Sequence, residues 1–133
     1  MAKELAIDVI KRFETLEPIA QNGCVASYCK KIKREDGLIN LDSAKEIYKK
    51  FRAYRGWPDI FLENGLKLID IELVDSNNHY RSGEILEINR DSIVVGCNKG
   101  SIKIYKLQPK SKKVMDAISY IVGRRLRVGD LII

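Results

Sequence analysis

The sequence predicts a mainly β fold with flanking helices (α+β), in the form of a small OB-like, partly open Greek-key β-barrel preceded by helices. The chain has 133 residues, enough for one core. Hydrophobic residues recur at helical spacing before Pro58, and five or six short β-rich runs separated by turn residues follow it. Closing such a short sheet into a barrel removes its exposed edges. A strongly twisted α+β sheet is the alternative.

A first amphipathic helix is predicted over residues 3–16. It ends before Pro18, because the residue that precedes a proline avoids the helical conformation. Residues 17–37 then form a long connector, which in one small domain indicates either function or a domain boundary. The apolar positions of the helix follow steps of four and three residues: Leu5, Val9, Phe13 and Leu16.

A second helix is predicted to begin at Ser43. Ser43 and Glu46 have the spacing of a capping box, in which each side chain accepts a hydrogen bond from the other residue's backbone amide. The run Gly56-Trp57-Pro58 ends this helix, and we expect Trp57 to plug one end of the barrel. The apolar stripe of the helix consists of Ala44, Ile47, Tyr48, Phe51 and Tyr54.

The β region is predicted to open with a hairpin. Asn64-Gly65 separates the runs 59–63 and 66–74, and this dipeptide favours a tight two-residue turn. In the later run 101–107, the alternation predicts Ile104 and Lys106 on one face and Leu107 on the other. The remaining predicted strands are 83–88, 92–97 and 128–133.

A third helix is predicted over residues 114–122, between the last two of these strands. Its apolar residues recur at helical spacing, so one face is expected to lie on the sheet. The residues expected on that inward face are Val114, Ala117, Ile118 and Ile121.

Several classes of protein are disfavoured by what the sequence lacks. No apolar run approaches the ~20 residues that cross a bilayer, and the charged N-terminal segment does not resemble a signal peptide, so we expect a cytoplasmic location and no membrane partner. The three cysteines show no C-x-x-C spacing, and Cys97 is expected to be buried. His79 is the only histidine, and no nucleotide-binding or hydrolase motif occurs. We therefore predict no catalytic and no metal-binding residue.

Basic residues are the strongest functional signal. The net charge is +6, the sign expected of a protein that meets phosphates, although each cluster alone could be an ordinary solvated face. Four clusters fall in the connector, on one stripe of the second helix, after Pro109 and before the last strand. If they converge, they form a track for a phosphate backbone. The predicted nucleic-acid-binding residues are Lys30, Lys31, Lys33, Arg34, Lys45, Lys49, Arg52, Arg55, Lys110, Lys112, Lys113, Arg124 and Arg125.

Several specific motifs occur together over about residues 20–133. They are Ser27-Tyr-Cys-Lys-Lys-Ile32, Arg52-Ala-Tyr-Arg-Gly-Trp-Pro58, Gly83-Glu-Ile-Leu86, Leu107-Gln-Pro-Lys-Ser-Lys-Lys-Val-Met115 and Gly129-Asp130. In their order and spacing these motifs resemble the C-terminal part of the methionyl-tRNA formyltransferase family.

The resemblance implies a division into a helix at 1–22 similar to the last helix of a catalytic domain, a basic linker at 23–42 and an OB-like barrel at 43–133. It implies that this domain helps to hold initiator tRNA, with Lys31, Arg52 and Lys112–Lys113 as carried-over contacts. The catalytic residues and the formyl-tetrahydrofolate cofactor would belong to a separate N-terminal formyltransferase domain, so the chain alone is expected to be inactive and to be part of a longer protein.

Two alternatives stay open at this stage. Related barrels end other folate-dependent formyltransferases, where the domain is mainly structural or oligomerising, and a free-standing oligonucleotide binder is a third possibility. The exposed apolar face of the first helix is expected to pack on its own barrel or on a second copy of the chain.

Overall fold

The computed structural model describes residues 2–20, 22–25 and 27–133. The chain divides into two compact units, Met1–Lys31 and Ile32–Ile133. Met1 and Gln21, which fall in the predicted segment 1–22, lie outside the described residues. The predicted boundaries at residues 22 and 42 stay a prediction.

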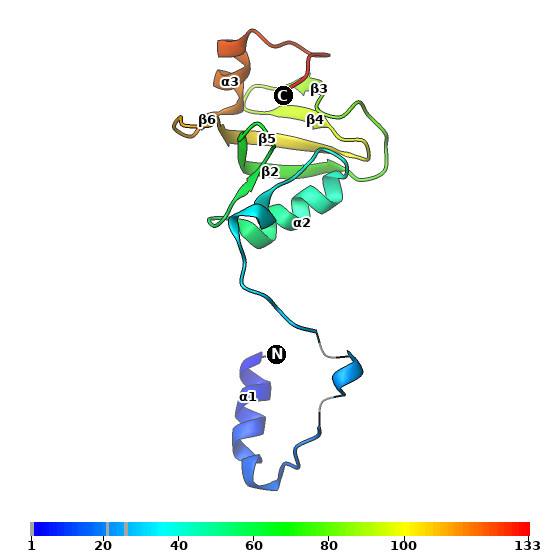
Figure 1. Cartoon of the computed structure of the whole chain (residues 1–133), viewed down its shortest axis with the longest axis vertical. Helices are drawn as coiled ribbons and strands as arrows, with labels where there is room; N and C mark the ends of the chain where they lie inside the picture. Colours follow the sequence, from blue (N-terminus) through cyan, green and yellow to red (C-terminus); the bar gives the residue numbers. More distant parts are fainter. Residues whose placement is uncertain (1, 21, 26) are drawn as a thin grey trace. The chain divides into compact units, whose positions relative to one another are not determined.

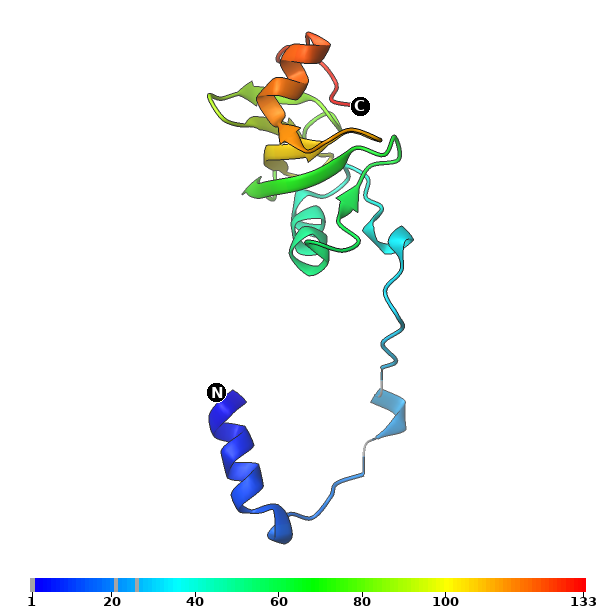
Figure 2. The same ribbon diagram turned by 90° about the vertical axis from the view of Figure 1, so that its left-hand side faces the viewer.

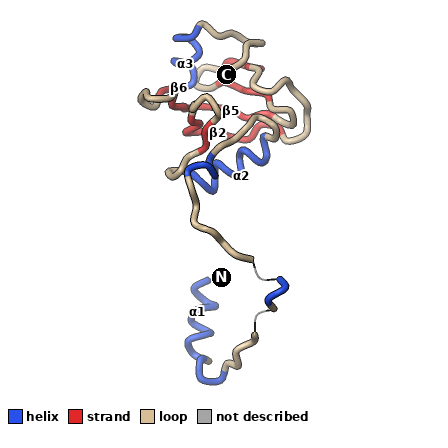
Figure 3. Tube along the Cα trace, viewed as in Figure 1, coloured by secondary structure: helices blue, strands red, loops and turns tan. Residues whose placement is uncertain are grey.

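The first unit contains short helices and exposed side chains. Its elements are α1 (Ala2–Lys11) and the 3-10 turns η1 (Phe13–Thr15) and η2 (Gly23–Val25), drawn as helix in Figure 3. The predicted helix over 3–16 is therefore confirmed, with its last turn in the tighter 3-10 form. The guanidinium of Arg12 bonds the Asp8 carboxylate one turn earlier. No described residue of α1 is buried, and Phe13 in η1 is 75% exposed.

The second unit is built on one antiparallel sheet (Figure 1). The strand order is β1-β2-β5-β4-β3, with β6 paired to β5. This is a Greek-key order, because β2 lies beside β5 while β3, β4 and β5 follow one another. The path does not close, so the predicted mainly β, partly open fold with flanking helices is confirmed. The strands are β1 (Ile60–Phe61), β2 (Lys67–Asp75), β3 (Ile85–Ile88), β4 (Ile93–Gly96), β5 (Ser101–Gln108) and β6 (Met115–Asp116).

Two helices and a 3-10 turn complete this unit: α2 (Ala44–Tyr54), α3 (Ala117–Arg124) and η3 (Arg34–Gly37). Figures 1 and 2 place α2 and α3 on opposite sides of the β2–β5 pair. Ser43 caps α2, its hydroxyl oxygen accepting from the Glu46 amide at 3.5 Å, which is one half of the predicted capping box. The Glu46 carboxylate bonds Lys49 instead of completing the other half. The predicted apolar stripe packs on the sheet through buried Ala44, Ile47 and Phe51.

The core centres on β5, whose neighbours are β2, β4 and β6. Ile102 and Ile104 are fully buried between β2 and β4. The prediction for Lys106 and Leu107 is wrong. The β2–β5 pairing shifts register near Asp70, so Lys106 faces solvent and Leu107 enters the core.

Three further sequence expectations are corrected by the structure. Residues 128–133 form no strand, since turns interrupt the run. They lie beside the start of β3 through the isolated bridge Glu84↔Leu131 and a few backbone hydrogen bonds. Helix α3 begins at Ala117 because Met115–Asp116 pairs with β5, which leaves Val114 48% exposed rather than inward. Trp57 is 60% exposed and does not plug the sheet, because it follows Gly56, whose φ of 93° turns the chain outward from the end of α2.

Candidate nucleic-acid interface

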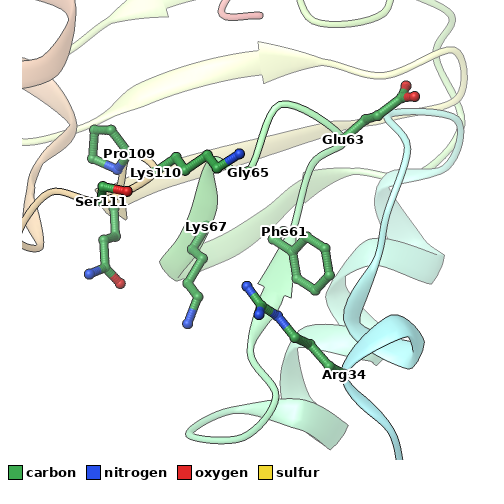
Figure 4. A pocket seen from close by; sticks show the side chains of 9 residues that line it. Arg34, Phe61, Glu63, Gly65, Lys67, Pro109, Lys110 and Ser111 are labelled. Carbon is green, nitrogen blue, oxygen red and sulfur yellow. The ribbon is translucent and has the colours of Figure 1, made fainter.

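A basic concavity of the second unit is a pocket of about 450 Å³, shown in Figure 4. Its wall comes from η3, β1, β2 and the loop between β5 and β6. Three of its side chains are cationic and one is a carboxylate. The carboxylate of Glu63 points away from the cationic groups in Figure 4. The lining residues are Arg34, Phe61, Glu63, Gly65, Lys67, Gln108, Pro109, Lys110 and Ser111.

Arg34 reaches this pocket because the segment around η3 is fastened to β1. The amide of Ile39 donates to the carbonyl of Phe61 at 2.9 Å, next to the parallel bridge between Leu38 and Phe61. The turn itself is closed by the Lys33 amide, which donates to the Asp36 carboxylate at 2.7 Å. The guanidinium carbon of Arg34 lies 6.0 Å from the centre of the Phe61 ring, the outer limit of a cation–π contact.

Lys67 enters the pocket from the first residue of β2. It pairs in register with Gln108, the last residue of β5, so the end of one strand brings the β5–β6 loop beside it. Its ammonium lies 3.3 Å from a carboxylate oxygen of Asp59, in a half-buried pair. Lys67 was not among the predicted site residues. The sequence feature that could have indicated Lys67 is its position just after the Asn64-Gly65 turn, where a strand begins beside a loop.

Lys110 comes from the loop that leaves β5. This loop is ordered by two bonds: the Lys112 amide donates to the Pro109 carbonyl at 3.1 Å, and the Gln108 side-chain amide donates to the Lys112 carbonyl at 2.7 Å. The Lys110 side chain lies over the β1–β2 turn, 3.2 Å from where a Cβ on Gly65 would stand. Two clusters that are distant in sequence, represented by Arg34 and Lys110, therefore line one pocket.

The basic stripe predicted on α2 is exposed but partly paired. The Lys49 ammonium bonds Glu46 at 2.8 Å, and this bond lowers the pKa of the Glu46 carboxyl. The Arg55 guanidinium lies 4.0 Å from Asp70 and 5.5 Å from the Phe51 ring centre. Lys45 and Arg52 are exposed and form no ion pair with any described residue. This stripe does not line the pocket.

The other predicted contacts lie elsewhere on the described surface. Lys112 and Lys113 are exposed in the β5–β6 loop, whereas Lys30, Lys31 and Lys33 flank the boundary between the units and are exposed too. At the end of α3, the Arg124 guanidinium lies 4.8 Å from the Tyr120 ring centre, and Arg125 takes the left-handed conformation that ends the helix. Arg34 and Lys110 are thus the two predicted residues that the pocket unites. Convergence of all four clusters stays a prediction.

His79 and Cys97 have surroundings set by the fold of the second unit. His79 lies 2.7 Å through Nδ1 from the Asn98 carbonyl. Burial, with the nearby Asp42 carboxylate, raises the pKa of the Cys97 thiol to about 12. Among the described residues there is no cluster of three or more His, Cys, Asp or Glu side chains that could hold a metal ion, and none of the helices is long and apolar enough to span a membrane.

Residues 31–125 match the family model described as "Formyl transferase, C-terminal domain". The chain belongs to this family. The match includes η3, α2 and every strand of the sheet, so all four elements that line the pocket lie inside the formyl transferase C-terminal domain. The resemblance inferred from the motifs is confirmed at this level.

Curated relatives of this domain are named methionyl-tRNA formyltransferase. The chain is 53% identical over 130 residues to the protein of a Nitratiruptor species, 47% over 131 residues to that of Wolinella succinogenes and 42% over 132 residues to that of Helicobacter pylori. These matches cover 98–99% of this chain but only 43–44% of each relative. The chain therefore spans less than half the length of the curated relatives it matches.

Solved structures support the fold of this formyl transferase C-terminal domain. A crystal structure of a HypX variant from Aquifex aeolicus superposes with a TM-score of 0.64 at 15% identity, over 96% of this chain and 24% of that one. A second HypX structure, in complex with tetrahydrofolic acid, gives a TM-score of 0.60 over 89% of this chain and 22% of that one. At this identity the likeness concerns the fold alone.

Proposed function

We propose that this chain is the tRNA-binding C-terminal part of a methionyl-tRNA formyltransferase. In this proposal it holds initiator tRNA in the bacterial cytoplasm while an N-terminal formyltransferase domain transfers the formyl group. The observation that carries the proposal is the extent of the similarity, which runs over 98% of the chain with a relative of that name. In this proposal the formyl-tetrahydrofolate donor binds to the N-terminal domain, and no residue of this chain contacts it.

The surface chemistry supports an RNA partner. Exposed cations occur at the unit boundary, on α2 and in the β5–β6 loop, and phosphate contacts made by such residues fix the orientation of a nucleic acid. The catalytic benefit of the domain is proximity, because a held acceptor end meets the reacting group without a separate diffusional search. The proposed phosphate contacts are Lys31, Lys33, Arg52, Lys112 and Lys113.

The test is a titration of the chain into labelled initiator tRNA at several salt concentrations, with an elongator tRNA alongside. Each phosphate contact contributes about 0.9 to the slope of log affinity against log salt for a duplex. Lys31→Ala with Lys33→Ala should therefore weaken binding and reduce this slope by roughly 1.8. The matched control is Lys3→Ala with Lys11→Ala, two lysines of α1 outside the proposed contacts.

Equal losses in the two double variants would remove Lys31 and Lys33 from the contact set. Absence of tRNA binding even at low salt would contradict the proposal and favour a structural or oligomerising domain of another folate-dependent formyltransferase.

A further inference from the structure

We propose that the pocket between Arg34, Lys67 and Lys110 binds a single unpaired nucleotide of an RNA chain. The phosphate lies among the cations and the base lies against the Arg34–Phe61 pair. This inference rests on the proposed function, because it assigns a particular site to the RNA that the chain binds. It goes beyond that function by separating a shaped site for one nucleotide from the general attraction of an exposed basic surface.

The first step is electrostatic. The lining residues carry three cations and one carboxylate, a formal charge of 3 − 1 = +2. Neither Arg34 nor Lys110 forms an ion pair with a residue inside the described ranges. Lys67 is engaged with Asp59 at 3.3 Å, but an ammonium has three donor hydrogens and keeps two of them. Such a concavity attracts a phosphate more strongly than the same charges on a flat face.

The second step is shape. A volume of about 450 Å³ falls within the ~300–1,000 Å³ of pockets that hold small organic ligands. Four segments form the wall. Two of them, β2 and the loop after β5, are held together by the register pair Lys67↔Gln108 and by the buried Pro109. The bases of a duplex are stacked and paired, so only the backbone of the duplex faces such a pocket. An unstacked nucleotide can enter it. The geometry therefore favours single-stranded RNA over duplex.

The third step is the planar surface offered to a base. RNA-binding proteins stack unpaired bases on aromatic rings and on guanidinium planes. The Arg34 guanidinium lies 6.0 Å from the half-buried Phe61 ring and is therefore loosely held. It can shift so that a base stacks either on the ring or on the guanidinium plane. The Gln108 amide nitrogen is used by the Lys112 carbonyl at 2.7 Å, so its carbonyl oxygen stays available as an acceptor for an amino group of the base.

The experiment follows backbone amide signals of the isotope-labelled full chain during titration with a trinucleotide RNA, with an RNA duplex and with inorganic phosphate. The signals of Gly65 and Ser111, which line the pocket, should shift most with the trinucleotide. Arg34→Met with Lys110→Met should weaken trinucleotide binding about tenfold and reduce its salt slope by about 1.4, at about 0.7 per contact for single strands. Arg90→Met with Lys99→Met is the matched control and should change it less than twofold, because both side chains are exposed and lie outside the pocket and the predicted contacts.

The ring is tested separately by Phe61→Leu, which keeps an apolar side chain beside the core. It should weaken trinucleotide binding severalfold and leave phosphate binding unchanged, with unaltered dispersion of the amide signals as evidence of folding. Equal weakening by both double variants, duplex binding as tight as that of the trinucleotide, or phosphate binding alone at the pocket would each overturn the inference. If initiator tRNA binds while the Gly65 and Ser111 signals stay fixed, only this inference fails. If no RNA binds, the proposed function fails with it.

Discussion

Gly37 lies directly against the backbone of Asp59. A Cβ built on Gly37 would stand 2.1 Å from the Asp59 carbonyl oxygen, and Pro58 and Phe61 atoms would lie within 3.2 Å of it. This close approach lets the segment after η3 run beside β1, where the Ile39 amide bonds the Phe61 carbonyl. Because Arg34 is in the same 3-10 turn, the contact also positions one wall of the basic pocket.

Gly37→Ala should therefore destabilise the second unit by roughly 1–3 kcal/mol, as overpacking against fixed backbone does. It should also weaken binding at the pocket, since η3 must move. The matched control is Gly123→Ala in α3, where a Cβ meets nothing within 4 Å and the substitution favours the helix. Urea unfolding of both variants measures the difference, and an equal effect of the two substitutions would contradict the close contact.

Ile104→Ala should remove a larger share of the stability. Ile104 is fully buried on β5, opposite Ile71 of β2 and Ile93 of β4, so its truncation leaves a cavity in the middle of the sheet. Such substitutions cost roughly 2–5 kcal/mol. Val122→Ala on the outer face of α3, 68% exposed, is the control and should change the free energy of unfolding by less than about 0.5 kcal/mol. Similar losses in the two variants would place the core elsewhere.

The three thiols should differ in reactivity at pH 8. Cys24 and Cys29 are exposed, whereas Cys97 is buried, and burial raises the pKa of its thiol to about 12. The thiolate is the reactive form, so a thiol reagent should modify two cysteines in the folded chain and the third only after unfolding. Mass spectrometry of the labelled chain gives the count. Rapid modification of Cys97 in the folded chain would contradict its burial.

The same thiol predicts a loss of stability at alkaline pH. A group whose pKa is higher in the folded state stabilises fully below the pKa of the unfolded thiol, about 8.5, and this contribution is lost as the pH rises toward the folded value of about 12. Unfolding of the parent should become easier between these values, and Cys97→Ala should lack this component of the pH dependence. The free energy of unfolding measured against pH in both chains tests this, and parallel profiles would contradict it.

Trp57 should behave as a surface residue. It is the only tryptophan of the chain and is 60% exposed, so its fluorescence should resemble that of a solvated indole and be quenched by iodide. Trp57→Ala should cost less than about 1 kcal/mol of stability, well below the ~3–5 kcal/mol of a buried tryptophan. A blue-shifted emission insensitive to iodide would show that the indole is covered.

The elements could be predicted from the sequence wherever one local pattern decides them. The capped helix at Ser43, the hairpin around Asn64-Gly65 and the alternation around Ile102 each depend on neighbours in the chain, and each was confirmed. The predicted two-residue turn was wrong, because the Leu62 amide bonds the Leu66 carbonyl and the connection is longer than Asn64-Gly65. The side-chain faces near Lys106 could not be predicted, because the register shift depends on the partner strand β2. The helical pattern at Val114 was likewise overridden by pairing of Met115–Asp116 with β5.

The candidate site shows the same division. The basic clusters were visible as composition, and they supplied Arg34 and Lys110. Lys67 was missed because it is a single lysine between Leu66 and Leu68, outside the four basic clusters. Its importance arises only when the Lys67↔Gln108 pairing carries it beside Lys110. Clusters of residues that are neighbours in the chain can be predicted from the sequence, whereas a pocket assembled from four separate segments cannot.

The position of β5 in the sheet governs the order in which this domain can form. Its partners β2 and β4 both precede it in the chain, and β2 has no neighbour except the two-residue β1 until β5 is present. During synthesis on the ribosome, the apolar face of β2 is therefore made well before the strand that covers it. The sheet can assemble only after Gln108 has emerged, so folding is expected to be a late, concerted event in translation rather than a stepwise one.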